Sequence, residues 1–272
     1  MSRVAAIQMA SGPNVGANLL EASRLIGLAA ASGAGLVVLP ENFAIMGAAE
    51  SDKLKVREQD GQGPIQDFLA HQAVKNNIWL VGGTIPLAAH NPGKVRAACL
   101  LFNPAGQRVT RYDKIHMFDV RIEESGENYT ESETIEAGDT TVVVDTPFGK
   151  LGLAVCYDLR FPELFRRMLD EGVELLALPS AFTAITGRAH WETLVRARAV
   201  ENLCYVIAAA QGGYHLGGRE THGDSMIVDP WGVVLDRLPR GSGYVSATID
   251  RARLASIRRS FPAIQHRKLG CS

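Results

Sequence analysis

Residues 150–163 read Lys-Leu-Gly-Leu-Ala-Val-Cys-Tyr-Asp-Leu-Arg-Phe-Pro-Glu, and this stretch decides the fold. Its first part, residues 151–155, is apolar without interruption, which is typical of a strand buried on both faces. Pro162 and Glu163 favour the first turn of a helix. Cys156 lies between them, at the carboxyl end of the predicted strand, where α/β folds place their chemistry. It is either a nucleophile or a small buried hydrophobic residue, since free cysteines are among the most buried residue types.

Apolar runs of this kind alternate with helical patterns along the chain. Residues 4–9, 18–31 and 36–39 predict a strand–helix–strand unit, and residues 151–155, 162–170 and 175–178 predict a second one. Two such units without a linker suggest one layered α/β domain over residues 1–272. Further strands are predicted at residues 78–85, 97–102, 109–112, 141–144, 204–209, 226–228, 233–235 and 244–249, and further helices at residues 65–75 and 190–202.

Two segments do not follow this alternation. Residues 119–140 are acidic and poor in apolar side chains, which predicts a long surface loop. Long loops in compact domains are often functional. The basic C-terminal segment, which includes Arg258 and Arg259, is predicted to be a solvated or partner-facing tail.

The composition is that of a globular protein with a large core, with 46% hydrophobic and 21% charged residues. The net charge of -1 gives no reason to expect nucleic acid or an acidic membrane surface as a partner. No segment has 18 uninterrupted apolar residues, and Gln8 interrupts the N-terminal run, so neither a membrane span nor a signal peptide is expected. Four widely spaced cysteines without a CxxC pair argue against a metal site and favour a reducing, cytoplasmic setting: Cys99, Cys156, Cys204 and Cys271.

Three predicted strands end in side chains that together suit acyl transfer, namely Glu41, Lys114 and Cys156. A carboxylate in an apolar setting has a raised pKa and can act as the base that the thiol needs. A nearby lysine ammonium would lower the thiol pKa and stabilise an oxyanion. The backbone N–H of Tyr157 is a natural second donor to that oxyanion.

Each of these residues also has an ordinary structural interpretation. Glu41 alone would be a solvated loop or cap residue, and Lys114 alone would be a surface residue. A cysteine–histidine hydrolase remains open, because three of the histidines that follow Cys156 could pair with it, although that cysteine lacks the flanking glycines of a sharp nucleophile turn. Those histidines are His190, His215 and His222. Dinucleotide, P-loop and G-x-S-x-G motifs are absent in the required context.

Residues 39–42, 112–119 and 152–163 together resemble the nitrilase, or carbon–nitrogen hydrolase, superfamily over essentially the full length. The resemblance implies a catalytic triad of Glu41, Lys114 and Cys156, with Glu131 as a second glutamate that orients the lysine and the substrate. It also implies a four-layer α-β-β-α sandwich that usually forms a homodimer with eight layers. No metal or organic cofactor is implied.

Residues 179–182, 186–192 and 196–199 are similar to the Nit branch of the superfamily, which contains deaminated glutathione amidase and ω-amidase. Residues 208–211 and 222–232 favour the first of these activities, as does Ser180. ω-Amidase action on α-ketoglutaramate stays open, because the acidic segment at residues 120–129 departs from both patterns. A pseudo-enzyme that serves as a binding or scaffold protein is the remote alternative.

Four residues after the predicted strands are candidates for contact with a small amide substrate. They are Asn42, Arg160, Phe182 and Thr183. Arg160 has an alternative as a structural ion-pair partner of Asp158 or Glu163. Phe182 is equally suited to core packing.

Overall fold

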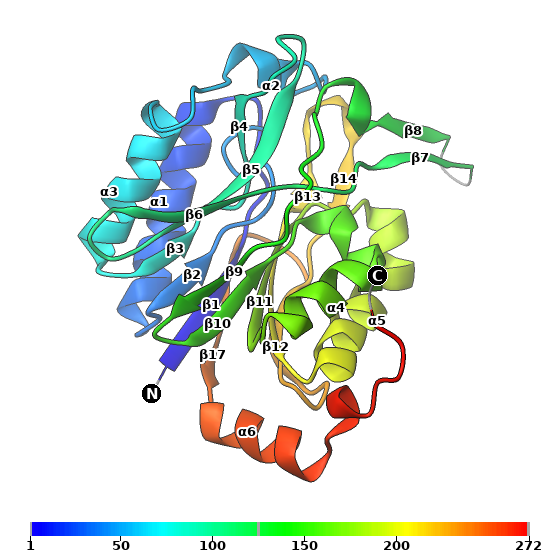
Figure 1. Ribbon diagram of the computed structural model, residues 1–272. Coiled ribbons are helices and arrows are strands. Elements are labelled where there is room, and N and C mark those ends of the chain that lie inside the picture. The colour runs from blue at the N-terminus through cyan, green and yellow to red at the C-terminus, as the bar shows by residue number, and fades with distance from the viewer. Residues whose placement is uncertain (1, 124–125, 271–272) are drawn as a thin grey trace.

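The computed structural model describes residues 2–123 and 126–270, and two β-sheets form its centre (Figure 1). The first sheet contains, in spatial order, β17 (Gly243–Ile249), β1 (Ser2–Gln8), β2 (Leu36–Val38), β3 (Trp79–Val81), β5 (Val95–Phe102) and β4 (Ile85–Ala88), with β6 (Arg108–Asp113) also paired to β5. The second contains β16 (Val234–Leu238), β15 (Ser225–Val228), β12 (Tyr205–Ala210), β11 (Leu175–Ser180), β10 (Gly149–Leu153) and β9 (Val143–Thr146).

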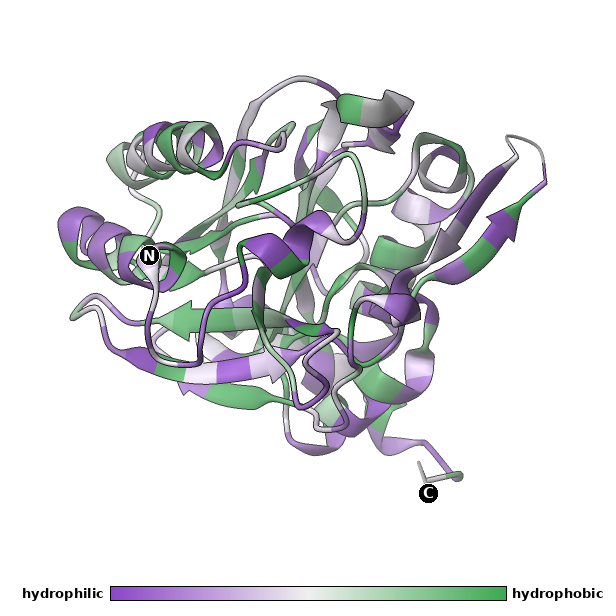
Figure 2. Ribbon diagram, turned by 90° about the horizontal axis from the view of Figure 1, so that it is seen from above, coloured by the Kyte–Doolittle hydropathy of each residue, from purple (hydrophilic) through white to green (hydrophobic). Residues whose placement is uncertain are grey.

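Helices cover the outer face of each sheet. α1 (Val15–Ala31) and α3 (Pro64–Asn76) lie against the first sheet, and α4 (Pro162–Asp170) and α5 (Ala184–Asn202) lie on the side of the second. The helices carry both hydrophobic and hydrophilic bands, as elements with one buried and one exposed face should (Figure 2). The layer order is therefore helix, sheet, sheet, helix, and the predicted α-β-β-α sandwich is confirmed.

The side chains of β1 show why the first sheet is buried on both faces. Val4 and Ala6 belong to the core between the two sheets, whereas Ala5 and Ile7 belong to the core beneath α1 and α3. Alternate residues of a strand point to opposite faces, so an uninterrupted apolar run fills both cores. The same logic explains why these strands were recognisable in the sequence.

Strand directions bring the predicted site residues to one edge of the first sheet. β2 is parallel to β1 and β3, β5 is antiparallel to β3, and β6 is antiparallel to β5. β2 and β6 therefore run in the same direction. The residues that follow them, Glu41 and Lys114, emerge at the same end of the sheet.

Residues 119–140 are not the long loop that their composition predicts. β7 (Asp119–Ile122) and β8 (Glu127–Thr130) pair as a hairpin that projects from the body (Figure 1), and the 3-10 helix η1 (Glu131–Glu133) follows. The four residues of β7 alternate between more exposed and more buried positions, which is the period of a strand. β7 and β8 have four residues each and pair with neither main sheet, so their apolar residues are too few to identify them as strands from the sequence. Two residues of the predicted loop, 124 and 125, lie outside the described part of the chain.

Other predicted boundaries were wrong by a few residues. The single strand expected over residues 78–85 is two strands, β3 and β4, separated at Gly83. That glycine has a φ of +56°, and a Cβ there would lie 2.1 Å from the carbonyl oxygen of Pro40. α5 begins six residues before the predicted start, because the Thr183 side chain caps it by accepting from the Thr186 N–H at 3.3 Å.

The basic C-terminal segment is a solvated tail only in part. Residues 265–270 are exposed, whereas Arg258 and Arg259 belong to α6 (Arg251–Ser260), whose Arg258 guanidinium donates to the carbonyl oxygens of Val173 at 2.6 Å and Leu203 at 2.9 Å. These bonds tie the helix to the second sheet and its connections. Cys271, in contrast, lies beyond the described residues, while Cys99, Cys156 and Cys204 are all buried thiols. Within residues 2–123 and 126–270, no helix is long and apolar enough to cross a membrane.

Candidate active site

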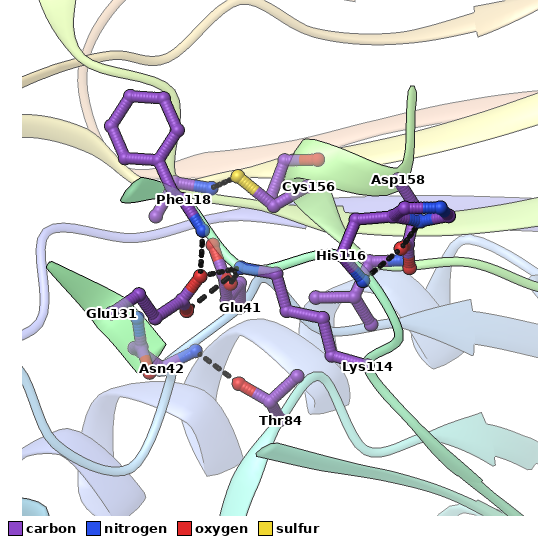
Figure 3. Close-up of polar contacts among 12 residues, drawn as sticks. Glu41, Asn42, Thr84, Lys114, His116, Phe118, Glu131, Cys156 and Asp158 are labelled. Carbon is purple, nitrogen blue, oxygen red and sulfur yellow. Dashed lines mark hydrogen bonds and ion pairs between the residues drawn. The ribbon is translucent and has the colours of Figure 1, made fainter. Parts of the chain in front are cut away.

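Four of the predicted residues meet where the two sheets face each other. Glu41 follows β2, Lys114 follows β6, and Cys156 opens the 3-10 helix η2 (Cys156–Arg160) after β10 (Figure 3). Glu131 reaches them from η1, at the base of the hairpin. All four are buried, with exposed fractions of 3%, 1%, 8% and 9% respectively. Charged residues are almost never buried to this degree unless they are paired.

Lys114 bridges two carboxylates. Its Nζ lies 2.9 Å from Glu41 Oε1 and 2.8 Å from both carboxylate oxygens of Glu131. The backbone N–H of Phe118 also donates to Glu131 Oε2, at 2.7 Å. Glu131 is therefore held from two sides, and the ammonium is fixed between the two glutamates.

Cys156 sits on a sharp turn between β10 and η2. Its φ is +48°, a left-handed conformation that residues other than glycine rarely adopt. The Ala181 N–H donates to its Sγ at 3.4 Å, and the Glu41 carboxylate is near enough to affect the pKa of the thiol. The lack of flanking glycines was therefore a poor argument against a nucleophile turn, because Cys156 itself takes the strained position. The Tyr157 N–H follows directly, at the start of η2.

A buried aspartate, Asp158, fixes this turn relative to the lysine segment. It accepts from the Val155 N–H at 2.8 Å, from the Tyr112 hydroxyl at 2.7 Å, and from the His116 N–H and Nδ1 at 3.1 and 2.7 Å. Tyr112 and His116 flank Lys114 in the chain. One carboxylate thus joins the cysteine of one sheet to the lysine of the other. No separate pattern indicates this role of Asp158, although Tyr112, His116 and Asp158 all lie within the quoted motifs.

An apolar setting predicts a raised pKa for Glu41, and this prediction was wrong. Burial, the largest influence, does raise it, but the charge of Lys114 and hydrogen bonds from Lys114 and Cys156 outweigh burial and lower the pKa. For Cys156, burial and the charge of Glu41 raise the thiol pKa well above its ordinary value, although Lys114 acts in the lowering direction as expected. Burial disfavours the Lys114 ammonium, yet Glu131 and Glu41 raise its pKa. The resting site therefore holds a carboxylate, an ammonium and a protonated thiol.

A narrow cavity opens onto Glu41, Lys114 and Glu131, while Cys156 is not part of its lining. Its volume of about 30 Å³ holds roughly one water molecule, so an amide substrate must displace part of the wall. The lining residues come from four segments of the chain: Glu41, Asn42, Glu50, Lys53, Lys114, Phe118, Tyr129, Thr130, Glu131 and Arg219. A much larger hollow of about 950 Å³ lies along α5 and the β13 (Gly212–Tyr214) and β14 (Glu220–His222) hairpin. None of the predicted catalytic residues lines that hollow.

The narrow cavity beside Lys114 is lined by only one of the four candidate substrate contacts, Asn42. Arg160 lies over the rings of Tyr157 and Phe182, at 5.9 and 5.4 Å from their centroids, and contacts His190 Nδ1 at 3.3 Å. The alternative prediction, an ion pair between Arg160 and Asp158, was wrong. The Asp158 carboxylate is bound instead by Tyr112 and His116. Phe182 is 6% exposed and packs edge-on against Trp191, as core packing predicts. Thr183 caps α5.

The three histidines considered for a cysteine–histidine pair contact residues other than Cys156. His190 contacts Arg160, His215 bonds to Ser11 O and Thr221 Oγ1 at 2.8 and 2.7 Å, and His222 lies 3.9 Å from Asp224. The base that touches the thiol is Glu41, so the arrangement disfavours a cysteine–histidine pair. Among the residues that the structure describes, no three His, Cys, Asp or Glu side chains are grouped as metal ligands.

Comparison with known proteins extends this picture to the whole chain. The carbon-nitrogen hydrolase family model matches residues 3–259. The deaminated glutathione amidase of Synechocystis is 44% identical over 266 residues, which cover 97% of each chain. Among solved structures, Saccharomyces cerevisiae Nit3, a member of branch 10 of the nitrilase superfamily, superposes with a TM-score of 0.88 at 32% identity and covers 98% of this chain and 97% of its own.

The NitFhit protein of C. elegans also has a TM-score of 0.88, at 36% identity. The match covers 98% of this chain but only 65% of that longer protein. Family model, sequence relatives and structural neighbours therefore agree over nearly the full length. The chain belongs to the carbon–nitrogen hydrolase family and is an enzyme of that family that acts on amides.

Proposed function

We propose that this enzyme cleaves its amide substrate through a thioester on Cys156. The observation that carries the proposal is one buried carboxylate, Glu41, which accepts from the Lys114 ammonium at 2.9 Å and lies near enough to the Cys156 thiol to raise its pKa. A carboxylate that is ionised at rest is ready to accept the thiol proton. The buried ammonium supplies a fixed positive charge where the carbonyl oxygen becomes negative.

The reaction proceeds in two halves. Glu41 takes the thiol proton, Cys156 Sγ attacks the amide carbon, and the carbonyl oxygen becomes an oxyanion held by Lys114 and the Tyr157 N–H. The C–N bond then breaks, the thioester remains, and protonated Glu41 gives its proton to the departing amine. Glu41 next removes a proton from water, which attacks the thioester and returns the acid product and the free thiol. Glu131 positions Lys114 throughout.

For the substrate we propose deaminated glutathione. The Synechocystis relative with that name supports this choice, as does its 97% coverage of both chains. The second candidate is ω-amidase action on α-ketoglutaramate. Both compounds deliver the same five-carbon keto-acid acyl group to the cysteine, and they differ in the leaving group, which is cysteinylglycine in the first and ammonia in the second.

A direct assay separates the two substrates and tests the nucleophile. Product formation from each compound is followed by chromatography with the wild type, Cys156→Ala and Cys204→Ala. Cys204 is a matched control, because it is also a buried thiol and lies directly before β12 of the same sheet. We expect a higher kcat/KM for deaminated glutathione, no turnover by Cys156→Ala, and near wild-type turnover by Cys204→Ala. Turnover by Cys156→Ala would contradict the mechanism, and preference for the short amide would reverse the substrate choice.

We further propose that residues 1–272 act as one domain, in the cytoplasm, and as a homodimer. The hollow of about 950 Å³ along α5 supports the dimer, because a concave surface of this size is suited to receive a protein partner. Val200 of α5 lines the hollow and is 47% exposed, and Tyr214 beside it is 77% exposed. Burying such apolar surface favours association.

A further inference from the structure

Arg219 lines the cavity, and the mechanism gives it no role. It lies between β13 and β14, and the His215 N–H donates to its carbonyl oxygen at 2.8 Å. His215 is itself anchored to Ser11 O and Thr221 Oγ1. The backbone of Arg219 is therefore fixed at the wall of the cavity, almost 180 residues away in sequence from Glu41.

The guanidinium of Arg219 is incompletely paired. Nη1 lies 3.3 Å from Glu50 Oε1 and Nη2 lies 3.4 Å from Ala181 O, both longer than typical charge-assisted hydrogen bonds. Its Nε is buried and has no hydrogen-bond partner among the described residues. Buried donors almost always have a partner in a native protein, so an unpaired one in a cavity wall points to a ligand that supplies the acceptor. The flat group also lies over the Tyr129 ring, 5.3 Å from its centroid.

Charge is unevenly distributed along the cavity. At the wall, Lys53 and Arg219 share the single carboxylate of Glu50, at 2.6 and 3.3 Å. At the inner end, Lys114 is shared by Glu41 and Glu131, so a negative charge is in excess there. An anionic group is therefore attracted to the wall and repelled from the inner end. This asymmetry orients a substrate that carries one carboxylate and one amide.

The distance from Arg219 to the nucleophile fits such a substrate. Ala181 contacts both residues, since its N–H donates to Cys156 Sγ and its carbonyl oxygen accepts from Arg219 Nη2, each at 3.4 Å. The guanidinium is thus at most about 10 Å from the sulfur, because the N and O atoms of one residue are less than 4 Å apart. In the proposed keto-acid acyl group, the carboxylate is four bonds from the carbon under attack, a span of roughly 5 Å when extended. The rest of the separation between guanidinium and sulfur is filled by the contact of the carboxylate with Arg219 and the contact of the carbonyl carbon with Sγ.

We propose that Arg219 binds the carboxylate of the keto-acid half of the substrate and makes the enzyme selective for amides that carry this anion. The inference rests on the proposed function. The substrate carboxylate takes the Nε and one Nη of Arg219 as a bidentate pair, which guanidinium geometry favours. Because both candidate substrates share this half, Arg219 selects the acyl group and leaves the choice of leaving group to other residues.

Kinetics on three compounds tests the assignment. They are deaminated glutathione, its analogue with the keto-acid carboxylate as a methyl ester, and its analogue with the glycine carboxylate as an amide. Arg219→Gln should reduce kcat/KM about 10- to 100-fold for the first and third compounds, mainly through KM, and have little effect on the ester. Arg219→Lys should recover part of the loss. The control is Arg24→Gln, which removes an exposed arginine paired with Glu21 on α1.

Two kinetic results would overturn the assignment. An equal loss on all three compounds would show a general structural role, and a loss that disappears only with the glycine amide would place Arg219 at the other end of the substrate. A binding measurement separates this inference from the proposed reaction. The acyl product, 2-oxoglutarate, should bind the wild type and Arg24→Gln equally in calorimetry, and Arg219→Gln at least about 10-fold more weakly. Equal binding by Arg219→Gln, or no binding by the wild type, would refute it, whether or not any amide is hydrolysed.

Discussion

At the scale of single residues, the protonation states of the site predict an unusual pH profile. Lys114 keeps the pKa of Glu41 below its ordinary value near 4.5, so the carboxylate loses its role as a base only as the pH falls below that range. Glu131 and Glu41 raise the pKa of Lys114 above 10.5, so its ammonium persists in alkaline solution. We therefore expect kcat/KM to be nearly constant from about pH 5 to about pH 9.

Initial rates in a series of buffers, with the fold monitored by circular dichroism at each pH, provide the measurement. If the thiolate formed before substrate binding, kcat/KM would instead rise steeply through the neutral range as Cys156 titrated. A rise of that kind would contradict the protonated thiol that burial and the charge of Glu41 produce.

The same residues show which parts of the site a sequence can reveal. Glu41, Lys114 and Cys156 each lie within three residues of the end of a strand, where α/β folds place their chemistry, so these three were predictable. Arg219 was not, because its partner Glu50 is 169 positions away and neither residue follows a strand of the main sheets. The pKa of Glu41 was also predicted in the wrong direction, since burial and an ion pair act oppositely and only the geometry decides between them.

At the scale of elements, the joint between β6 and η2 is the feature that aligns the two sheets at the site. Tyr112, at the end of β6, donates its hydroxyl to Asp158 of η2 at 2.7 Å. Burial and the charge of Asp158 raise the pKa of Tyr112 well above its ordinary value, so the hydroxyl stays protonated and remains a donor. Lys114 lies two residues after Tyr112, and Cys156 lies two residues before Asp158.

Tyr112→Phe should therefore weaken both stability and catalysis. Removing one donor to a buried carboxylate costs about 1–3 kcal/mol of unfolding free energy, measured by denaturant titration. We expect kcat to fall more than KM rises, because the relative position of lysine and thiol matters most in the transition state. Tyr244→Phe is the control, since within the described residues the Tyr244 hydroxyl makes no hydrogen bond. A variant with unchanged kcat and unchanged stability would show that the joint is dispensable.

Element boundaries were predicted well where the apolar period was long and poorly where single side chains decide. β11 and β12 are buried throughout and were recognised from apolar runs. The start of α5 depends on the Thr183 cap, and the break between β3 and β4 depends on the close approach of Gly83 to Pro40 O. α6 was missed because only Leu254 of its ten residues is buried, which leaves no apolar period to detect; Leu254 packs into the core, and Arg253 and Arg258 add polar attachments.

At the scale of the whole molecule, the open question is which outer layer forms the proposed dimer. An eight-layer assembly requires two copies to pack through one helical face, either α1 with α3 or α4 with α5. Both faces carry exposed apolar residues, including Leu20 on α1, which is 78% exposed, and Val200 on α5. The hollow of about 950 Å³ lies on the α5 side and its lining includes Val200 and Tyr214, so we expect this face to carry the contact.

A pair of charge substitutions distinguishes the two faces. Light scattering coupled to size exclusion should give the wild type a mass of twice the 29.3 kDa of the chain. Val200→Glu should shift it to the single-chain mass at low micromolar concentration, because the contact would then have to remove a carboxylate from water in place of an apolar side chain. Leu20→Glu should leave the dimer intact. The reverse result would move the interface to α1 and α3, and a wild type of single-chain mass would refute the dimer. A dimer that survives both substitutions would place the contact away from these two helices, and the hollow along α5 would then need another occupant.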